Sequence, residues 1–239
     1  MVPRSGLSLK FERGNLRGLL GDLSKVEPWL RDVEEVLSRI ANLRRESIFV
    51  SKKRTQKDGI DGLLNSVLHR SIELSQGIII CVNAGCIGST LCLVRAHMEV
   101  AAQLMWLAHE LFLRDGSPTE TRKSVLQAFL GTRDVELKNE GEPWFSTAIN
   151  VLTFMDAADT LLGKGSLRKP YESLCELVHP NAEANLLYAR VMKNKRGSVF
   201  GTTFAFSNHM LTTALLNLRR SLRAFEAAWE ILQSKVRSL

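Results

Sequence analysis

The chain has no charged side chain between Glu73 and Arg95. Such a run is long enough to cross a bilayer, because about 20 residues of apolar helix span the hydrocarbon core. Its sequence is LSQGIIICVNAGCIGSTLCLV, in which Gln76, Asn83, glycines and hydroxyl residues leave only the two ends strongly apolar. Asparagine and glycine also permit a bend in the backbone. The run therefore favours two buried helical segments that meet near residues 83–85, with membrane association as an alternative.

Apolar residues recur at helical spacing through most of the chain, as in EPWLRDVEEVLSRIANLRRE. Together with capping and breaking residues, this pattern predicts helices over residues 27–46, 59–82, 86–114, 118–138, 144–162 and 208–236, and one that starts at Pro170. Strand character surrounds only the turn-like KNKRG. The sequence thus predicts an all-α multi-helix bundle with one small β-hairpin near 190–206. It also predicts an N-terminal basic helical segment, 1–58, and a helical bundle domain, 59–239.

The net charge of +7 is concentrated at the two ends of the chain. Residues 1–58 carry 13 Lys and Arg against 8 Asp and Glu, residues 186–239 carry 9 against 2, and the middle is net −5. If the ends lie together, they form a basic face that attracts RNA or another polyanion. The candidate nucleic-acid-binding residues are Lys193, Lys195, Arg196, Arg219, Arg220 and Arg223.

Cysteine and histidine spacing points away from a metal centre. Cys81, Cys86, Cys92 and Cys175 form no CxxC pair, and the five histidines form no ligand cluster. We therefore expect reduced thiols packed like small hydrophobes, no metal and no cofactor. The N-terminus lacks the apolar core of a secretory signal, so a cytoplasmic location is expected.

Two polar groups interrupt apolar helical stripes. Arg95 and Glu99 are one turn apart in a helix and can pair, but a partly buried guanidinium needs further acceptors. In YESLCELVHPN, Pro180 ends the helix and leaves His179 at its exposed end. We expect this junction to supply the missing partners. The candidates are catalytic residues His179, Arg95 and Glu99, and ligand-binding residues Glu176, Asn181 and Tyr171.

The same residues carry a resemblance to a known group of proteins. R-x-x-x-E in a long apolar helix, followed by Y-x-x-L-x-E-x-x-H-P-N from Tyr171 to Asn181, resembles an uncharacterised family of bacterial helical proteins distantly similar to the HEPN superfamily. The resemblance covers roughly residues 60–235 and implies a helical bundle that is often a homodimer. Many HEPN proteins are metal-independent ribonucleases of toxin or defence systems, and active members carry R-x(4 to 6)-H. No histidine of this chain has an arginine at that spacing before it.

Three functions are compatible with these features. The first is a non-enzymatic helical module that binds nucleic acid or a partner protein through the basic ends of the chain. The second is a metal-independent, toxin-like ribonuclease in which His179 acts as acid or base and Arg95 stabilises the phosphorane. The third is a membrane-associated helical protein.

Overall fold

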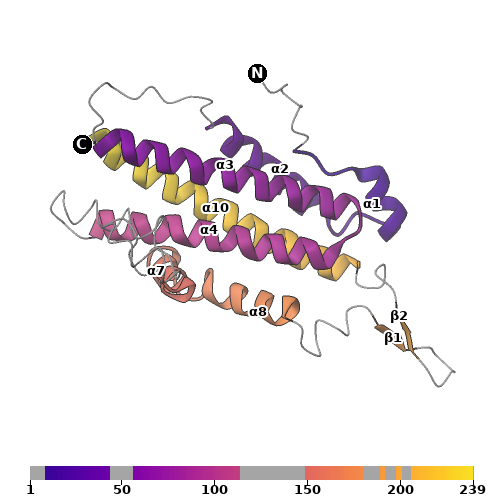
Figure 1. Cartoon of the computed structure of the whole chain (residues 1–239). Coiled ribbons are helices and arrows are strands. Elements are labelled where there is room, and N and C mark those ends of the chain that lie inside the picture. The colour runs from indigo at the N-terminus through magenta and orange to yellow at the C-terminus, as the bar shows by residue number, and fades with distance from the viewer. Residues whose placement is uncertain are drawn as a thin grey trace, which may run out of the picture.

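The protein is an all-α bundle (Figure 1). A computed structural model describes residues 9–43, 56–113, 149–179, 189–191, 198–200 and 206–238. The helices in these ranges are α1 (Arg13–Leu20), α2 (Glu27–Asn42), α3 (Gln56–Asn83), α4 (Ile87–Leu113), α7 (Val151–Leu162), α8 (Arg168–Val178) and α10 (Asn208–Ser238). They account for more than half of the chain. No helix within the described ranges is long and apolar enough to cross a membrane.

Helix α4 lies at the centre of the bundle. It packs on α10 and α3 on one side and on α7 and α8 on the other. This position agrees with its composition, because nearly every residue from Val100 to Ala108 is buried. Helix α2 packs along α10 through a buried stripe at helical spacing, which contains Leu30, Val33, Leu37 and Ile40. The first and last parts of the chain therefore lie together.

The charge-free run forms two helices joined by a tight turn, as predicted. Helix α3 ends at Asn83, Gly85 takes a φ of 72°, and α4 begins at Ile87. The positive φ suits a glycine, because a side chain with a Cβ is strained there. The prediction that both segments are buried is wrong in part: Ile80 is 66% exposed, and Cys86 and Cys92 are exposed free thiols instead of core residues.

Several helix boundaries differ from the predicted ones. Helix α1 was not predicted, since its apolar residues are few. Helix α7 begins at Val151 instead of residue 144, because the side chain of Asn150 accepts a hydrogen bond from the Leu152 amide, 3.0 Å away, and caps the helix. Helix α8 ends before His179, whose ψ of 148° is extended, as expected for a residue that precedes proline. The helix predicted over 118–138 lies outside the described residues.

Two strands of three residues each lie apart from the helices (Figure 1). Strand β1 (Ala189–Val191) pairs antiparallel with β2 (Ser198–Phe200), and Arg190 is opposite Val199. These three pairs are all that the described residues show, so the hairpin predicted near 190–206 is not borne out. Lys193, Lys195 and Arg196 lie outside the described residues.

Candidate functional site

The contact between α4 and α8 brings Arg95, Glu99 and Tyr171 together. The Arg95 Nη2 donates a hydrogen bond to the Tyr171 hydroxyl over 3.3 Å, and this hydroxyl donates to Glu99 Oε1 over 2.9 Å. The Arg95 Nε lies 3.3 Å from the same Glu99 oxygen, one turn along α4. The guanidinium also lies over the tyrosine ring, 5.4 Å from its centroid. The predicted i, i+4 pair is thus present, and its third member is the tyrosine from the start of α8.

The electrostatics of this cluster raise the pKa values of Arg95 and Tyr171. Burial alone lowers the pKa of Arg95, but the hydrogen bond to Tyr171 and the charge of Glu99 outweigh it and raise the pKa. Burial raises the pKa of the Tyr171 phenol above its usual range; the bond from Arg95 opposes this, and the bond to Glu99 adds to it. The Arg95 Nε is buried without a hydrogen bond, so its ion pair with Glu99 is not well aligned. At neutral pH the Tyr171 phenol therefore stays protonated between the guanidinium and the carboxylate.

The other residues of the predicted site lie elsewhere. His179 is exposed at the far end of α8, eight residues beyond Tyr171, which corresponds to about 12 Å of helix. Its backbone N–H is bonded to the Cys175 carbonyl, and its ring makes no hydrogen bond to Arg95 or Glu99. Glu176 is exposed on the same helix, and Asn181 lies outside the described residues. The hydrogen bond that we expected between His179 and Arg95 or Glu99 is therefore absent.

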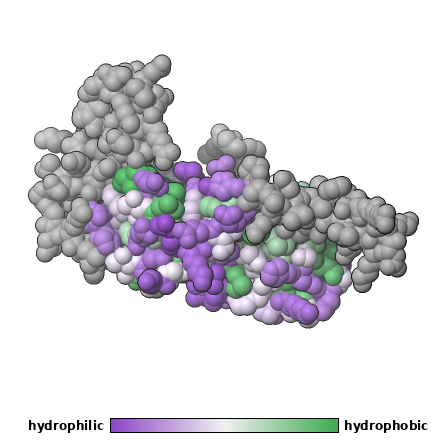
Figure 2. All heavy atoms as spheres, turned by 90° about the horizontal axis from the view of Figure 1, so that it is seen from below, coloured by the Kyte–Doolittle hydropathy of each residue, from purple (hydrophilic) through white to green (hydrophobic). Residues whose placement is uncertain are grey.

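The turn between α7 and α8 is organised by Asp159. Its carboxylate accepts hydrogen bonds from the backbone amides of Gly165 and Leu167, each over 2.7 Å, and from Arg168 over 3.3 Å. Arg168 is the first residue of α8, Leu167 is its N-cap and Gly165 lies in the turn before it. Unpaired N–H groups at a helix N-terminus favour a negative charge. The Arg168 guanidinium bridges Asp156 and Glu172 beside an open hollow of about 800 Å³. Figure 2 shows hydrophilic residues gathered in the middle of this face.

Two of the three α10 arginines that were predicted to bind nucleic acid are engaged with α2. Arg219 and Arg223 both form ion pairs with Asp32, the latter over 3.1 Å, and the Arg219 guanidinium lies over the ring of Trp29. Burial raises the pKa of Asp32, but the two arginines outweigh it and lower the pKa below its usual value. Arg220 is exposed and donates to Asn217. These cations fasten α10 to α2, so only part of their charge faces solvent.

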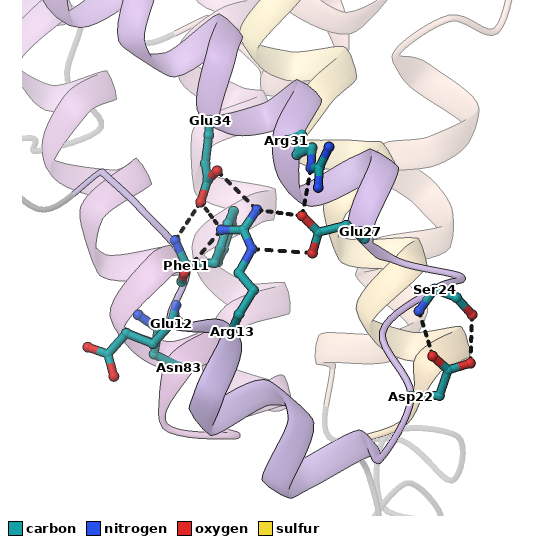
Figure 3. Close-up of polar contacts among 9 residues, drawn as sticks. All are labelled: Phe11, Glu12, Arg13, Asp22, Ser24, Glu27, Arg31, Glu34 and Asn83. Atoms are coloured by element: carbon teal, nitrogen blue, oxygen red, sulfur yellow. Dashed lines mark hydrogen bonds and ion pairs between the residues drawn. The ribbon is translucent and has the colours of Figure 1, made fainter.

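A further ionic cluster, around Arg13, holds the N-terminal segment on the bundle (Figure 3). Arg13 forms an ion pair with Glu34, donates to Glu27 over 3.3 Å, and has a raised pKa because of these carboxylates, Glu34 first. Glu34 also accepts from the Phe11 amide over 2.7 Å. Arg17 and Arg31 line the same open hollow of about 410 Å³ beside this network. The segment around Phe11 and Arg13 is therefore tied to α2 by charge as well as by burial.

Sequence reasoning missed a polar group in the core. His97 is fully buried on α4, and its ring nitrogens lie 2.8 Å from the Ser71 hydroxyl of α3 and 2.6 Å from the Ser221 hydroxyl of α10. Burial lowers the pKa of the imidazole to about 4, so the ring is neutral at pH 7. Ser71, His97 and Ser221 are all inaccessible to solvent, so their hydrogen bonds link α3, α4 and α10 inside the core. The only sequence signal was a histidine and two serines on otherwise apolar stripes.

The chain was compared with models of protein families, with curated proteins and with solved structures. None of the three comparisons found a match, so the family of the chain is not shown.

Proposed function

We propose that the chain is a non-enzymatic helical module that binds RNA or another polyanion, in a bacterial stress or defence system of the kind that the HEPN resemblance implies. The observation that carries the proposal is the packing of α2 along α10. This packing brings parts of the two ends of the chain together. Within the described residues 9–43 the N-terminal end carries six Lys and Arg against six Asp and Glu, so its positive excess belongs to residues 1–8 and 44–58, outside the described ranges.

The internal ion pairs do not remove this charge. The two ends hold 22 Lys and Arg against 10 Asp and Glu, so every acid in them can pair and a net charge of +12 remains. Arg17 and Lys25 are among the cations exposed to solvent in the N-terminal part. An excess of Lys and Arg attracts phosphates through counterion release, which needs no defined pocket and reads no base. The proposal therefore expects little sequence preference.

The geometry gives less support to a ribonuclease. Acid–base cleavage of RNA needs an imidazole and a cation at the same phosphate, within hydrogen-bonding distance of the reacting atoms. Arg95 is held by Glu99 and Tyr171, and no hydrogen bond joins the His179 ring to any of these three residues. These contacts therefore do not hold the imidazole and the guanidinium at one site.

Fluorescence anisotropy with a labelled single-stranded RNA tests the binding proposal. We expect affinity to fall with salt, by roughly 50-fold between about 50 and 200 mM for a site with about four phosphate contacts. The double variant Arg17→Glu, Lys25→Glu should weaken binding strongly. The matched control is the double variant Lys164→Glu, Lys169→Glu. It makes the same change in net charge at two exposed positions on the side of the bundle formed by α7 and α8. Equal losses in the two variants, or binding that ignores salt, would contradict a basic face formed by the chain ends.

The same RNA tests the absence of catalysis. We expect the labelled strand to remain intact during long incubation, with and without EDTA. Cleavage that is lost in His179→Ala and retained in His69→Ala, another exposed histidine, would replace the binding module by the ribonuclease.

A further inference from the structure

Two cysteines lie on either side of the turn between α3 and α4. Cys81 is in the last turn of α3, and Cys86 directly precedes α4. The Cys86 amide donates a hydrogen bond to the Cys81 carbonyl over 2.8 Å. Inside this bond, the Gly85 amide donates to the Val82 carbonyl over 3.0 Å, and Gly85 has a positive φ. The two nested bonds define a Schellman motif, which folds the chain back at the end of a helix and places Cys86 beside Cys81.

The same motif brings the two thiols together. In a Schellman motif, the side chains at the positions of Cys81 and Cys86 are commonly in contact. The Cys86 sulfur lies beside the turn, where it donates a weak hydrogen bond to the Ala84 carbonyl over 3.8 Å. A main-chain hydrogen bond holds two Cα atoms roughly 5 to 6 Å apart, within the range of about 4.4 to 6.8 Å that a disulfide spans. The backbone is therefore already in position for a bridge between the two cysteines.

The two thiols differ in their access to solvent. Cys86 is exposed, whereas Cys81 is half-buried. Burial raises the pKa of the Cys81 thiol, and a negative charge on Cys86 raises it further. An oxidant in solution attacks the thiol that it can reach, and a protonated thiol reacts poorly with it. Cys86 therefore meets an oxidant first, and Cys81 stays available as the second thiol.

We propose that Cys81 and Cys86 form an oxidation site, at which hydrogen peroxide converts the two thiols into a reversible disulfide across the α3–α4 turn. The Cys86 sulfur attacks one oxygen of the peroxide, the O–O bond breaks, and a sulfenic acid and one water result. The Cys81 sulfur then attacks the Cys86 sulfur and gives up its proton. The S–S bond forms as the S–O bond breaks, and a second water leaves. A dithiol reductant restores both thiols by exchange.

The bridge closes a turn that also receives the N-terminal segment. The side-chain oxygen of Asn83 accepts a hydrogen bond from the Glu12 amide over 2.8 Å. The Leu19 side chain of α1 lies so close to Gly85 that an added Cβ there would be 3.1 Å from it. Oxidation therefore acts on the part of the hairpin against which α1 lies. The inference does not depend on RNA binding, so either proposal can fail without the other.

Mass spectrometry of the full chain tests the site after brief treatment with a small excess of hydrogen peroxide and alkylation of the remaining thiols with N-ethylmaleimide. Trypsin releases residues 71–95 as one peptide, which contains Cys81, Cys86 and Cys92. We expect this peptide to lose two hydrogen atoms and to carry one alkyl group, on Cys92. Dithiothreitol before alkylation should restore all three thiols. In a glutathione buffer, the effective concentration of Cys81 at Cys86 should be at least about tenfold higher in the folded chain than in concentrated urea.

Single variants separate the roles of the three cysteines. Cys92→Ser is the matched control and should form the disulfide like the wild type, since this exposed cysteine lies about 9 Å of helix beyond Cys86. Cys81→Ser should leave Cys86 as a sulfenic acid that dimedone traps, and Cys86→Ser should leave Cys81 open to alkylation. Alkyl groups on both Cys81 and Cys86 after peroxide treatment of the wild type would overturn the proposal. So would disulfides that include Cys92 equally often, or equal effective concentrations in the folded and unfolded chain.

Discussion

Lowering the pH from 7.5 to about 5 should destabilise the bundle through His97. This imidazole is neutral in the fold, where one ring nitrogen donates a hydrogen bond and the other accepts one, and the Ser71 and Ser221 hydroxyls can serve in either role. Protonation places a positive charge in a fully buried position between α3, α4 and α10. The unfolded chain has no such restriction, because its imidazole is in water. The His97 imidazole therefore binds a proton more tightly in the unfolded chain than in the folded protein.

The magnitude follows from the two pKa values. Burial lowers the pKa of His97 from 6.5 to about 4 in the folded protein. Because the folded value is the lower one, the favourable contribution of the neutral ring is complete above pH 6.5 and is lost as the pH falls toward 4. The loss is about 2 kcal/mol at pH 5 and approaches about 3 kcal/mol below pH 4.

Urea unfolding at several pH values measures this effect when wild type and His97→Gln are compared. Glutamine does not titrate, so the difference between the two proteins removes the contributions of the carboxylates and of the other four histidines. The free energy of unfolding of the wild type should fall by about 2 kcal/mol more than that of the variant between pH 7.5 and 5. A difference that stays constant over this range would refute the assignment of a buried, neutral His97.

Three further changes test the contacts between helices by denaturant unfolding at neutral pH. Tyr171→Phe should cost about 1 to 2 kcal/mol, because Arg95 and Glu99 lose the hydroxyl that both contact; no loss would mean that the cluster adds nothing to packing. Asp159→Ala should cost about 2 kcal/mol and Asp159→Asn clearly less, since asparagine keeps an acceptor for the α8 amides; equal effects would exclude this capping role. Asp32→Asn should cost under about 1 kcal/mol, as expected for a partly exposed ion pair, and should tighten RNA binding by releasing two arginines. Unchanged RNA affinity would separate these arginines from the binding face.

The helical regions could be predicted because periodicity is a local property. Helix α10 begins at Asn208, as predicted, and the break after Asn83 follows from asparagine and glycine in an otherwise helical run. Helix boundaries were harder to predict where a single side chain sets the first or last residue of the helix. The Asn150 cap shortens α7, and α1 depends on contacts with α2 and α3 that no local pattern shows.

For hydrogen bonds between helices, the sequence predicted the type of partner but not which residue provides it. A partly buried Arg95 needs an acceptor besides Glu99, and the structure supplies the Tyr171 hydroxyl from α8. Sequence favoured the other end of the same helix, because it is more polar, but the crossing point of α4 and α8 is set by packing of the whole bundle. For the same reason the Ser71 and Ser221 partners of His97, from helices far apart in sequence, had no local signal.

The central position of α4 also implies that the helices around it differ in local stability. Helices α7 and α8 pack on α4 and on each other, whereas α2, α3 and α10 share contacts with one another as well as with α4 or its neighbours. The α7–α8 pair can therefore detach while the rest of the core stays closed. In native-state hydrogen exchange its amides should exchange together and early, as one cooperative unit, and the amides around His97 should be among the last to exchange.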